Sequence, residues 1–200
     1  MLTADSDILL WINGHYADWL DAFMWAVSRS KTWLWLYILL VGLVVYKFRN
    51  WKVVLSILVA FGIVVGLSDF TCSGILKPLV CRLRPTHDPA LDPVRLVYGY
   101  MGGLYGFCSS HAANTMSVAL LFSLIYRNKI ATAGLMTWVA LNCYSRMYLG
   151  AHYPSDILAG LLIGAAYALP VYWALRRWVL KPEPCGSRHA DDEVTPPGDS

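Results

Sequence analysis

The chain has 200 residues, of which 57% are hydrophobic and 14% are charged, and its formal net charge is +3. Water-soluble domains carry about 25% charged residues, so this composition excludes a disordered chain, a coiled coil and an ordinary cytosolic enzyme. Nine Trp and twelve Tyr residues favour a membrane protein, because amphipathic aromatic rings gather at membrane surfaces. No basic patch with interleaved aromatic residues is present in the sequence, which argues against nucleic acid as a partner.

The N-terminal segment is predicted to form an interfacial helix. Apolar side chains recur at helical spacing over Ile8–Val27, but polar residues such as Asn13, Asp18 and Asp21 interrupt them. This pattern is poor for a spanning helix and typical of a helix that lies at the membrane surface. The segment does not resemble a signal peptide, because acidic residues occupy the place of the basic region.

Five stronger apolar runs follow and are predicted to span the bilayer. They are Trp33–Tyr46, Val53–Leu76, Ala112–Tyr126, Ile130–Cys143 and Ile157–Val179. Some are shorter than the roughly 20 residues of a full span, and their polar flanks would extend them into the headgroups. The sequence therefore predicts an all-α integral membrane bundle with about five transmembrane helices plus the N-terminal interfacial helix. Residues 1–180 would form one domain, and the polar, Pro-rich residues 181–200 a disordered tail.

Basic residues in the short loops predict the orientation of this bundle. Three clusters fall on one side if five helices span, namely Lys47, Arg49 and Lys52, then Arg127 and Lys129, then Arg176, Arg177 and Lys181. Such loops face the cytoplasm, so the N-terminal helix and the long loop 77–108 would face outward. Several basic residues on the outer side oppose this rule, which suggests that they bind something. They are Lys77, Arg82, Arg84, Arg95 and Arg146.

Polar residues form clusters at this outer end. Lys77 and Arg84 are seven residues apart, which is two helical turns, so both cations could point into one pocket. Ser109, Ser110 and His111 stand where the third apolar run begins. The free backbone N–H groups of a helix start bind anions.

A third cluster contains Arg146, His152 and Asp156. Asp156 follows His152 by four residues, so at a helix start its carboxylate could accept a hydrogen bond from the imidazole ring. Taken singly, each member of the three clusters could have a purely structural role. Lys77 and Arg84 could extend to lipid headgroups, Ser109 and Ser110 could cap a helix, and a histidine could be hydrogen-bonded within the fold. Together they supply two histidines, a carboxylate, three cations and a hydroxyl at one membrane face. Phosphoryl transfer uses this set of groups.

These residues closely resemble the three motifs of the type 2 phosphatidic acid phosphatase family, K-x6-R-P, P-S-G-H and S-R-x5-H-x3-D. The first and third motifs are complete, as Lys77 to Arg84-Pro85 and as Ser145-Arg146 to His152 and Asp156. The second motif reads Cys108-Ser109-Ser110-His111, so Cys replaces Pro and Ser replaces Gly. Three motifs in order with matching spacing, over about residues 68–165, make the resemblance specific.

The resemblance implies a lipid phosphatase that needs neither a metal nor another cofactor. It implies that His152 attacks phosphorus, that Asp156 orients His152, and that His111 protonates the leaving group and then activates water. The implied phosphate-binding residues are Lys77, Arg84, Ser109, Ser110 and Arg146. The sequence also lacks a carboxylate cluster of the kind that binds magnesium.

The motifs indicate the reaction class and leave several lipid substrates open. The resemblance implies a membrane-embedded enzyme acting on a lipid phosphate in the bilayer, in a bacterial cytoplasmic membrane with its site facing outward. Undecaprenyl diphosphate is the first candidate, and lipid A (1- or 4'-phosphate), phosphatidylglycerophosphate and phosphatidic acid are alternatives. A catalytically silent lipid-binding protein is an alternative of another class, although the histidines and the aspartate are retained. A transporter is disfavoured, because charged residues are not spread through the apolar runs. The oligomeric state is left open.

Asp69 interrupts the second apolar run. A carboxylate inside such a run is costly and is a functional candidate, but it could also pair with another helix of the bundle. Asn114 and Asn142 could form hydrogen bonds between helices. The cysteines show no C-x-x-C pair, which argues against a zinc site, and they leave open one bridge among Cys72, Cys81 and Cys108.

Overall fold

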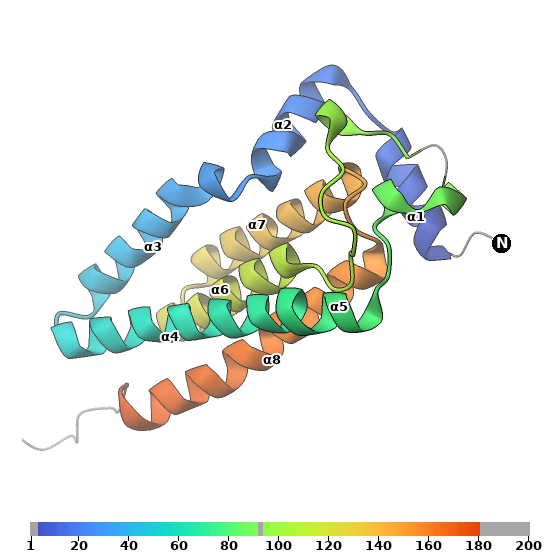
Figure 1. Cartoon of the computed structure of the whole chain (residues 1–200). Helices are drawn as coiled ribbons and strands as arrows, with labels where there is room; N and C mark the ends of the chain where they lie inside the picture. Colours follow the sequence, from blue (N-terminus) through green and yellow to red (C-terminus); the bar gives the residue numbers. More distant parts are fainter. Residues whose placement is uncertain (1–3, 92–93, 181–200) are drawn as a thin grey trace, which may run out of the picture.

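The computed structural model describes residues 4–91 and 94–180, which form a bundle of helices (Figure 1). The α-helices are α1 (Ala4–Gly14), α2 (Asp18–Ser28), α3 (Leu34–Lys47), α4 (Trp51–Asp69), α5 (Lys77–Val80), α6 (Ser110–Tyr126), α7 (Lys129–Tyr148) and α8 (Pro154–Trp178). Short 3-10 turns occupy Ser30–Trp33, Pro85–His87, Pro89–Leu91 and Val97–Gly99. The described ranges contain no β-strand, only one isolated bridge between Leu83 and Tyr105. The predicted all-α class is confirmed, while the predicted tail at 181–200 lies outside the described residues.

Helix α6 lies at the centre of the bundle, against α4, α7 and α8. Its closest approach is to α8, at Gly160 and Gly164. A Cβ atom at Gly160 would meet the carbonyl oxygen of Ser109, and one at Gly164 would meet that of Ala113. Small residues at every fourth position let two helix backbones approach closely. This packing fixes the start of α8 beside the start of α6.

The helices that carry the motifs begin at residues suited to helix starts. Helix α6 follows Ser109, whose Oγ accepts the Ala112 N–H at 3.4 Å. Helix α7 follows Asn128, whose Oδ1 accepts the Ala131 N–H at 2.9 Å. Helix α8 has Pro154 in its first turn, where the missing N–H costs no hydrogen bond. These local signals place the motif residues at one end of the bundle.

Helix α4 continues through a π-helical segment, Phe70–Leu76, into the short helix α5. The helix then ends at Cys81, which has a left-handed φ of 51°. Arg84 follows in extended backbone, where its N–H donates to the Leu104 carbonyl at 3.0 Å. The expectation that Lys77 and Arg84 lie two turns apart on one helix is therefore wrong, because the helix stops between them.

The predicted interfacial helix over Ile8–Val27 is two helices, α1 and α2, separated just after Gly14. Asn13 joins α1 to distant parts of the chain. Its Nδ2 donates to the Tyr148 carbonyl at 2.8 Å, and its Oδ1 accepts the Arg95 N–H at 2.8 Å. The polar residue that weakens the case for a spanning helix thus holds α1 against the end of α7 and the long loop.

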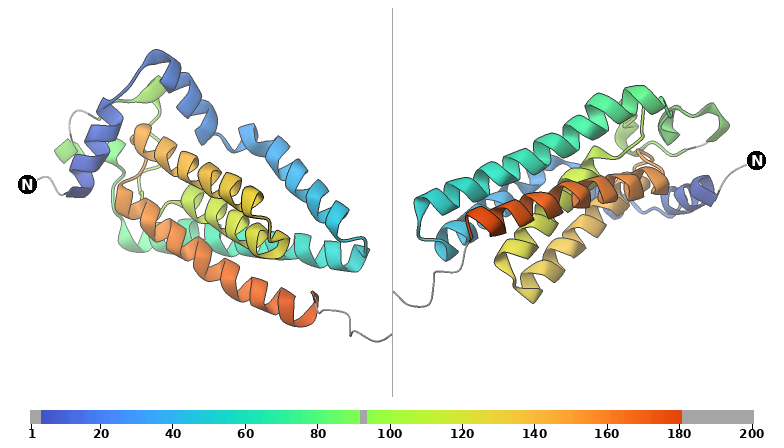
Figure 2. Two further views of the ribbon diagram at one scale, coloured as in Figure 1. Left: turned by 180° about the vertical axis from the view of Figure 1, so that it is seen from behind. Right: turned by 90° about the horizontal axis from the view of Figure 1, so that it is seen from below.

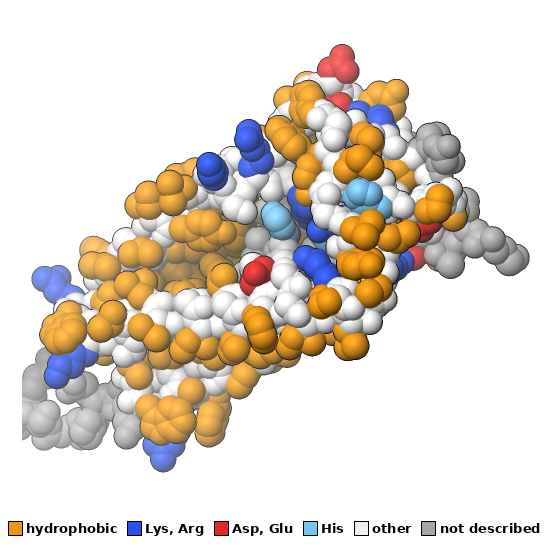
Figure 3. All heavy atoms as spheres, viewed as in Figure 1, with side chains coloured by type: hydrophobic (Ala, Val, Ile, Leu, Met, Phe, Trp, Pro, Cys, Tyr) orange, Lys and Arg blue, Asp and Glu red, His pale blue; other side chains and the backbone are white. Residues whose placement is uncertain are grey.

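Helix α3 stands apart from the rest of the bundle. It meets α4 at the short loop 48–50, and the two helices diverge toward their other ends (Figures 1 and 2). In the space-filling view a hollow with hydrophobic walls lies between them (Figure 3). Figure 3 also shows basic and histidine side chains at one end of this hollow.

Three helical segments within the described ranges are long and apolar enough to cross a membrane: Ser30–Lys47, Trp51–Val80 and Pro154–Trp178. They expose many large hydrophobic side chains, including Ile38, Val59 and Leu162, each at least 53% exposed. Such a surface suits contact with lipid. The protein is therefore a helical membrane protein, and the number of about five spans stays a prediction.

Candidate active site

The two cations of the first motif, Lys77 and Arg84, line the same cavity. Lys77 Nζ donates to Ser110 Oγ at 3.0 Å and to Ser73 Oγ at 3.3 Å. Arg84 is buried, and its Nε and Nη1 donate to the carbonyl oxygens of Tyr105 and Ala151, at 3.2 and 3.4 Å. These contacts are to neutral oxygens, so both cations keep their charge available for an anion.

The second motif places its two serines differently. Ser109 is fully buried, and its Oγ caps α6. The Ser109 hydroxyl, predicted to bind phosphate, therefore does not line the cavity described below. Ser110 does line it, and its Oγ contacts Ser73 Oγ at 2.8 Å as well as Lys77. His111 follows on the first turn of α6 and also lines the cavity.

The two departures in this motif are accommodated in different ways. Cys108 is fully buried beside Cys72, with the two Sγ atoms 2.7 Å apart, and both are free thiols. Cys108 thus fills a small apolar space next to the π-helical segment. Ser110 lies in the first turn of a helix, in ordinary helical backbone that does not require glycine. The possible bridge among the cysteines is not formed.

The third motif brings together a histidine and a carboxylate. His152 lies in the turn between α7 and α8, and its Nδ1 is 3.7 Å from Asp156 Oδ2. That distance is too long for a hydrogen bond, and His152 Nδ1 has no other partner among the described residues. Asp156 Oδ2 instead accepts the Tyr153 N–H at 3.1 Å, and Oδ1 accepts Arg82 Nη1 at 2.9 Å. The carboxylate is thus fixed beside the imidazole.

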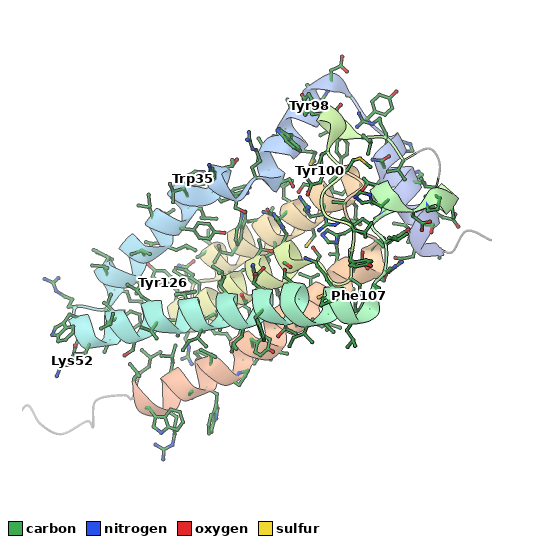
Figure 4. The ribbon with its side chains drawn as sticks, viewed as in Figure 1. Trp35, Lys52, Tyr98, Tyr100, Phe107 and Tyr126 are labelled. Carbon is green, nitrogen blue, oxygen red and sulfur yellow. The ribbon has the colours of Figure 1, made fainter. Side chains whose placement is uncertain are left out.

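Arg146, the motif's remaining cation, is buried near the end of α7. Its Nη1 donates to Ser28 Oγ, and its Nη2 donates to Tyr100 Oη at 2.9 Å. Figure 4 shows Tyr100 in the long loop at the end of the bundle that carries the motifs. Arg146 is therefore held by hydroxyl groups from α2 and from the loop, and it forms no ion pair with a carboxylate within the described residues.

One cavity of about 780 Å³ connects these groups. Its polar end is lined by Lys77, Arg84, Ser110, His111, Arg146 and His152. Its other walls are largely apolar and come from α3, α4, α6 and α7, and they include Leu40, Val44, Phe61, Val65, Val118 and Trp138. The cavity corresponds to the hollow between α3 and α4 in Figure 3. It offers three cations and two imidazoles at one end and hydrocarbon-like walls at the other.

The electrostatic environment keeps His152 neutral. Burial lowers the pKa of His152, and the positive charges of Arg146, Arg84 and Lys77 lower it further. A neutral imidazole has a free lone pair, so it can act as a nucleophile. The same three cations can neutralise the oxygens of a bound phosphate. No group of three or more His, Cys, Asp or Glu that could hold a metal occurs within residues 4–91 and 94–180.

Comparison with known proteins agrees with this arrangement. The family model described as the PAP2 superfamily matches residues 51–180. The chain belongs to the PAP2 superfamily. It is therefore a membrane phosphatase, an enzyme that hydrolyses phosphate esters, and the resemblance found in the three sequence motifs is confirmed.

Individual relatives extend this assignment. The chain is 37% identical to the lipid A 4'-phosphatase of Porphyromonas gingivalis, over 90% of this chain and 78% of that protein. It is 36% identical to the lipid A 4'-phosphatase of Bacteroides thetaiotaomicron, over 80% of this chain and 72% of that protein. An undecaprenyl-diphosphatase from Sulfolobus acidocaldarius is 26% identical over 77% of this chain and 70% of that protein.

Solved structures share the fold of this PAP2 protein. A transmembrane PAP2-type phosphatidylglycerolphosphate phosphatase from Bacillus subtilis matches 88% of this chain and 87% of its own, with a TM-score of 0.64 and 21% identity. Aquifex aeolicus LpxE matches 85% of this chain and 95% of its own, with a TM-score of 0.57 and 22% identity. At these identities the likeness describes the helical membrane fold.

Sequence reasoning missed several residues of this PAP2 site. Arg82 lies inside the first motif and is among the outer basic residues that the sequence predicts to bind something, but its two carboxylate partners could not be predicted. It contacts Asp156 and also Asp5, with Nη2 2.6 Å from Asp5 Oδ2. Asp5 lies 77 positions earlier in the chain, so no local pattern indicates the contact. Tyr100 and Ser73 likewise carry no motif signal.

Proposed function

We propose that this protein is a lipid A phosphatase that removes the 4'-phosphate through a phosphohistidine intermediate. The observation that carries the proposal is the single cavity whose cationic end continues into apolar walls, because such a cavity suits a phosphate attached to acyl chains. The two relatives at 36% and 37% identity favour lipid A over undecaprenyl diphosphate, which the sequence analysis placed first.

In this proposal the phosphate binds between Lys77, Arg84 and Arg146. Since Nδ1 of His152 is directed to Asp156, its Nε2 is the nitrogen that attacks. The N–P bond forms while the P–O bond to the sugar breaks. Burial and the charges of Arg146, Arg84 and Lys77 lower the pKa of His111 to about 3 in the free protein. His111 therefore gains its proton when the bound phosphate offsets these cations, and it gives that proton to the leaving oxygen.

The second half-reaction returns the enzyme to its starting state. Neutral His111 takes a proton from a water molecule, whose oxygen attacks phosphorus and breaks the N–P bond. Inorganic phosphate leaves, and His152 regains its lone pair. The N–H of Ser110, at the start of α6, is positioned as a further donor to the phosphate oxygens. The cations perform the charge neutralisation that a metal ion supplies elsewhere.

The proposed location is a bacterial inner membrane, with the site facing the periplasm. The basic residues of the α3–α4 and α6–α7 loops and of the end of α8 gather at the end of the bundle opposite the motifs (Figures 1 and 3). Short basic loops of this kind face the cytoplasm. The motif end, with α1 and α2, would then lie at the outer surface.

Phosphate release from a panel of lipids tests the proposal. Purified protein in detergent with EDTA is given lipid A, undecaprenyl diphosphate, phosphatidylglycerophosphate and phosphatidic acid, with His152→Ala as the control. We expect the fastest release from lipid A, with mass spectrometry of the product showing loss of the 4'-phosphate. In His152→Ala release should fall by about a thousandfold or more. Faster release from undecaprenyl diphosphate would overturn the substrate, and a strict Mg²⁺ requirement would overturn the mechanism.

A further inference from the structure

Two polar side chains outside the three motifs line the same cavity. Asp69 ends α4, and Asn114 lies in the second turn of α6. Asn114 Nδ2 donates to Asp69 Oδ1 at 3.5 Å, a long and weak contact. Asp69 precedes Lys77 by eight residues, about two helical turns, and Asn114 follows Ser110 by one turn. The pair therefore lies between the cationic end and the apolar walls.

These two residues have more hydrogen-bonding capacity than the described parts of the protein use. Asn114 Oδ1 is buried and has no hydrogen-bond partner among the described residues. Asp69 forms no ion pair within them, and its one recorded hydrogen bond is the long contact from Asn114. Asp69 also lies within the segment Trp51–Val80, which contains an 18-residue window of mean hydropathy 2.4 and is long enough to span a membrane. A carboxylate at such a depth is costly unless donors satisfy it.

We infer that Asp69 and Asn114 form a specificity site that accepts hydrogen bonds from hydroxyl or amide N–H groups of the substrate, next to its phosphate. The inference rests on the proposed function and narrows it. A phosphorylated sugar with amide-linked acyl chains carries such donors, whereas a polyprenyl diphosphate has hydrocarbon there. A lipid without donors would leave the Asp69 and Asn114 oxygens without a partner on the substrate, which is how polar sites reject analogues.

A matched pair of lipids isolates this effect. Ceramide 1-phosphate carries an amide N–H and a hydroxyl near its phosphate, and phosphatidic acid with equal chain lengths carries neither. The measured quantity is the ratio of kcat/KM for ceramide 1-phosphate to that for phosphatidic acid. The variants are Asp69→Leu, Asn114→Leu and the milder Asp69→Asn, which keeps one acceptor oxygen. Leu67→Ala serves as a control, because Leu67 lies on the same helix, is 41% exposed and does not line the cavity.

We expect the wild-type ratio to exceed one and to fall about tenfold in Asp69→Leu, as when a hydrogen bond to a charged group is lost. Asn114→Leu and Asp69→Asn should lower the ratio by smaller factors, and Leu67→Ala should leave it within about twofold. An unchanged ratio in folded Asp69→Leu would overturn the inference, even if both rates fall together. If Asp69→Leu does not fold, an unchanged ratio in both Asn114→Leu and Asp69→Asn would overturn it.

A binding measurement separates this inference from the proposed function. The His152→Ala variant is expected to bind lipid without hydrolysing it. In this variant, the rise in melting temperature on adding each lipid therefore reports binding without turnover. Stronger stabilisation by ceramide 1-phosphate, lost in the Asp69→Leu double variant, would support the specificity site even if lipid A is not hydrolysed. Equal stabilisation by the two lipids would contradict it. Failure of the wild type to release phosphate from lipid A would instead contradict the proposed function.

Discussion

Arg82 occupies a central place among the residues around His152, the proposed nucleophile. Its guanidinium lies between Asp5 and Asp156, at 2.6 and 2.9 Å, and stacks over the Tyr153 ring with 3.9 Å to the centroid. Burial lowers the pKa of Arg82, but the hydrogen bond to Asp5 and the charges of Asp156 and Asp5 outweigh this and raise it. Arg82 thus stays charged and holds the Asp156 carboxylate, whose Oδ2 lies 3.7 Å from His152 Nδ1.

Replacing Arg82 with Ala should lower kcat by about tenfold while changing KM much less, because Arg82 positions Asp156 and does not line the cavity. The stability loss should be about 1–3 kcal/mol, below the value for a fully buried pair, because the Arg82 side chain is 31% exposed. Steady-state kinetics and thermal unfolding in detergent measure both effects.

Arg82→Lys provides the matched control, since it keeps the charge but cannot span both carboxylates equally well. It should recover part of kcat. A variant whose KM rises while kcat is retained would show that Arg82 binds substrate directly and would contradict the positioning role.

The elements that carry the site depend on close helix packing. Asp156 lies in the first turn of α8 and His111 in the first turn of α6, so their relative placement follows from the contact at Gly160 and Gly164. Around a Cβ at Gly164, Met116 Cβ and Ser117 N would lie at 3.0 Å, closer than ordinary contacts, and the Ala113 carbonyl closer still. These atoms belong to α6, so they cannot make room for a side chain at Gly164 unless α6 itself shifts.

Gly164→Val should therefore destabilise the protein by about 1–3 kcal/mol, because the added methyl groups force α6 and α8 apart. The melting temperature in detergent and the rate of phosphate release should both fall. Gly134→Ala in α7 is the control, because a Cβ there meets nothing within 4 Å. It should be neutral or slightly stabilising, since Ala favours helix over Gly. A Gly164→Val protein as stable as Gly134→Ala would show that the two helices do not need this contact.

For the molecule as a whole, the sequence predicts the helical membrane bundle and the place of the site. Lys77, Arg84, His111, Arg146 and His152 all line one cavity, because the motif spacing places each at a helix start, a helix end or an adjoining turn. Residues whose geometry depends on local backbone were predicted less well. The Ser109 side chain caps helix α6 and does not line the cavity. Cys81, in left-handed backbone, ends the helix between Lys77 and Arg84.

Other features could not be predicted because they depend on contacts far apart in the chain. The break between α1 and α2 is accompanied by hydrogen bonds between Asn13 and residues of the long loop and of α7. The bridge from Asp5 to Arg82 joins the first helix to the first motif. Such contacts join residues far apart in the chain, and no local periodicity in the sequence encodes them.

The central claim is that the cationic end of the cavity transfers phosphate from a lipid to His152. The most direct measurement mixes the protein with lipid A carrying a radiolabelled 4'-phosphate, in EDTA, and stops the reaction in alkali within the first turnover. We expect label on the protein that withstands alkali, is lost in acid and is absent from His152→Ala. Equal labelling of His152→Ala, or phosphate release with no labelled protein at any quench time, would contradict it.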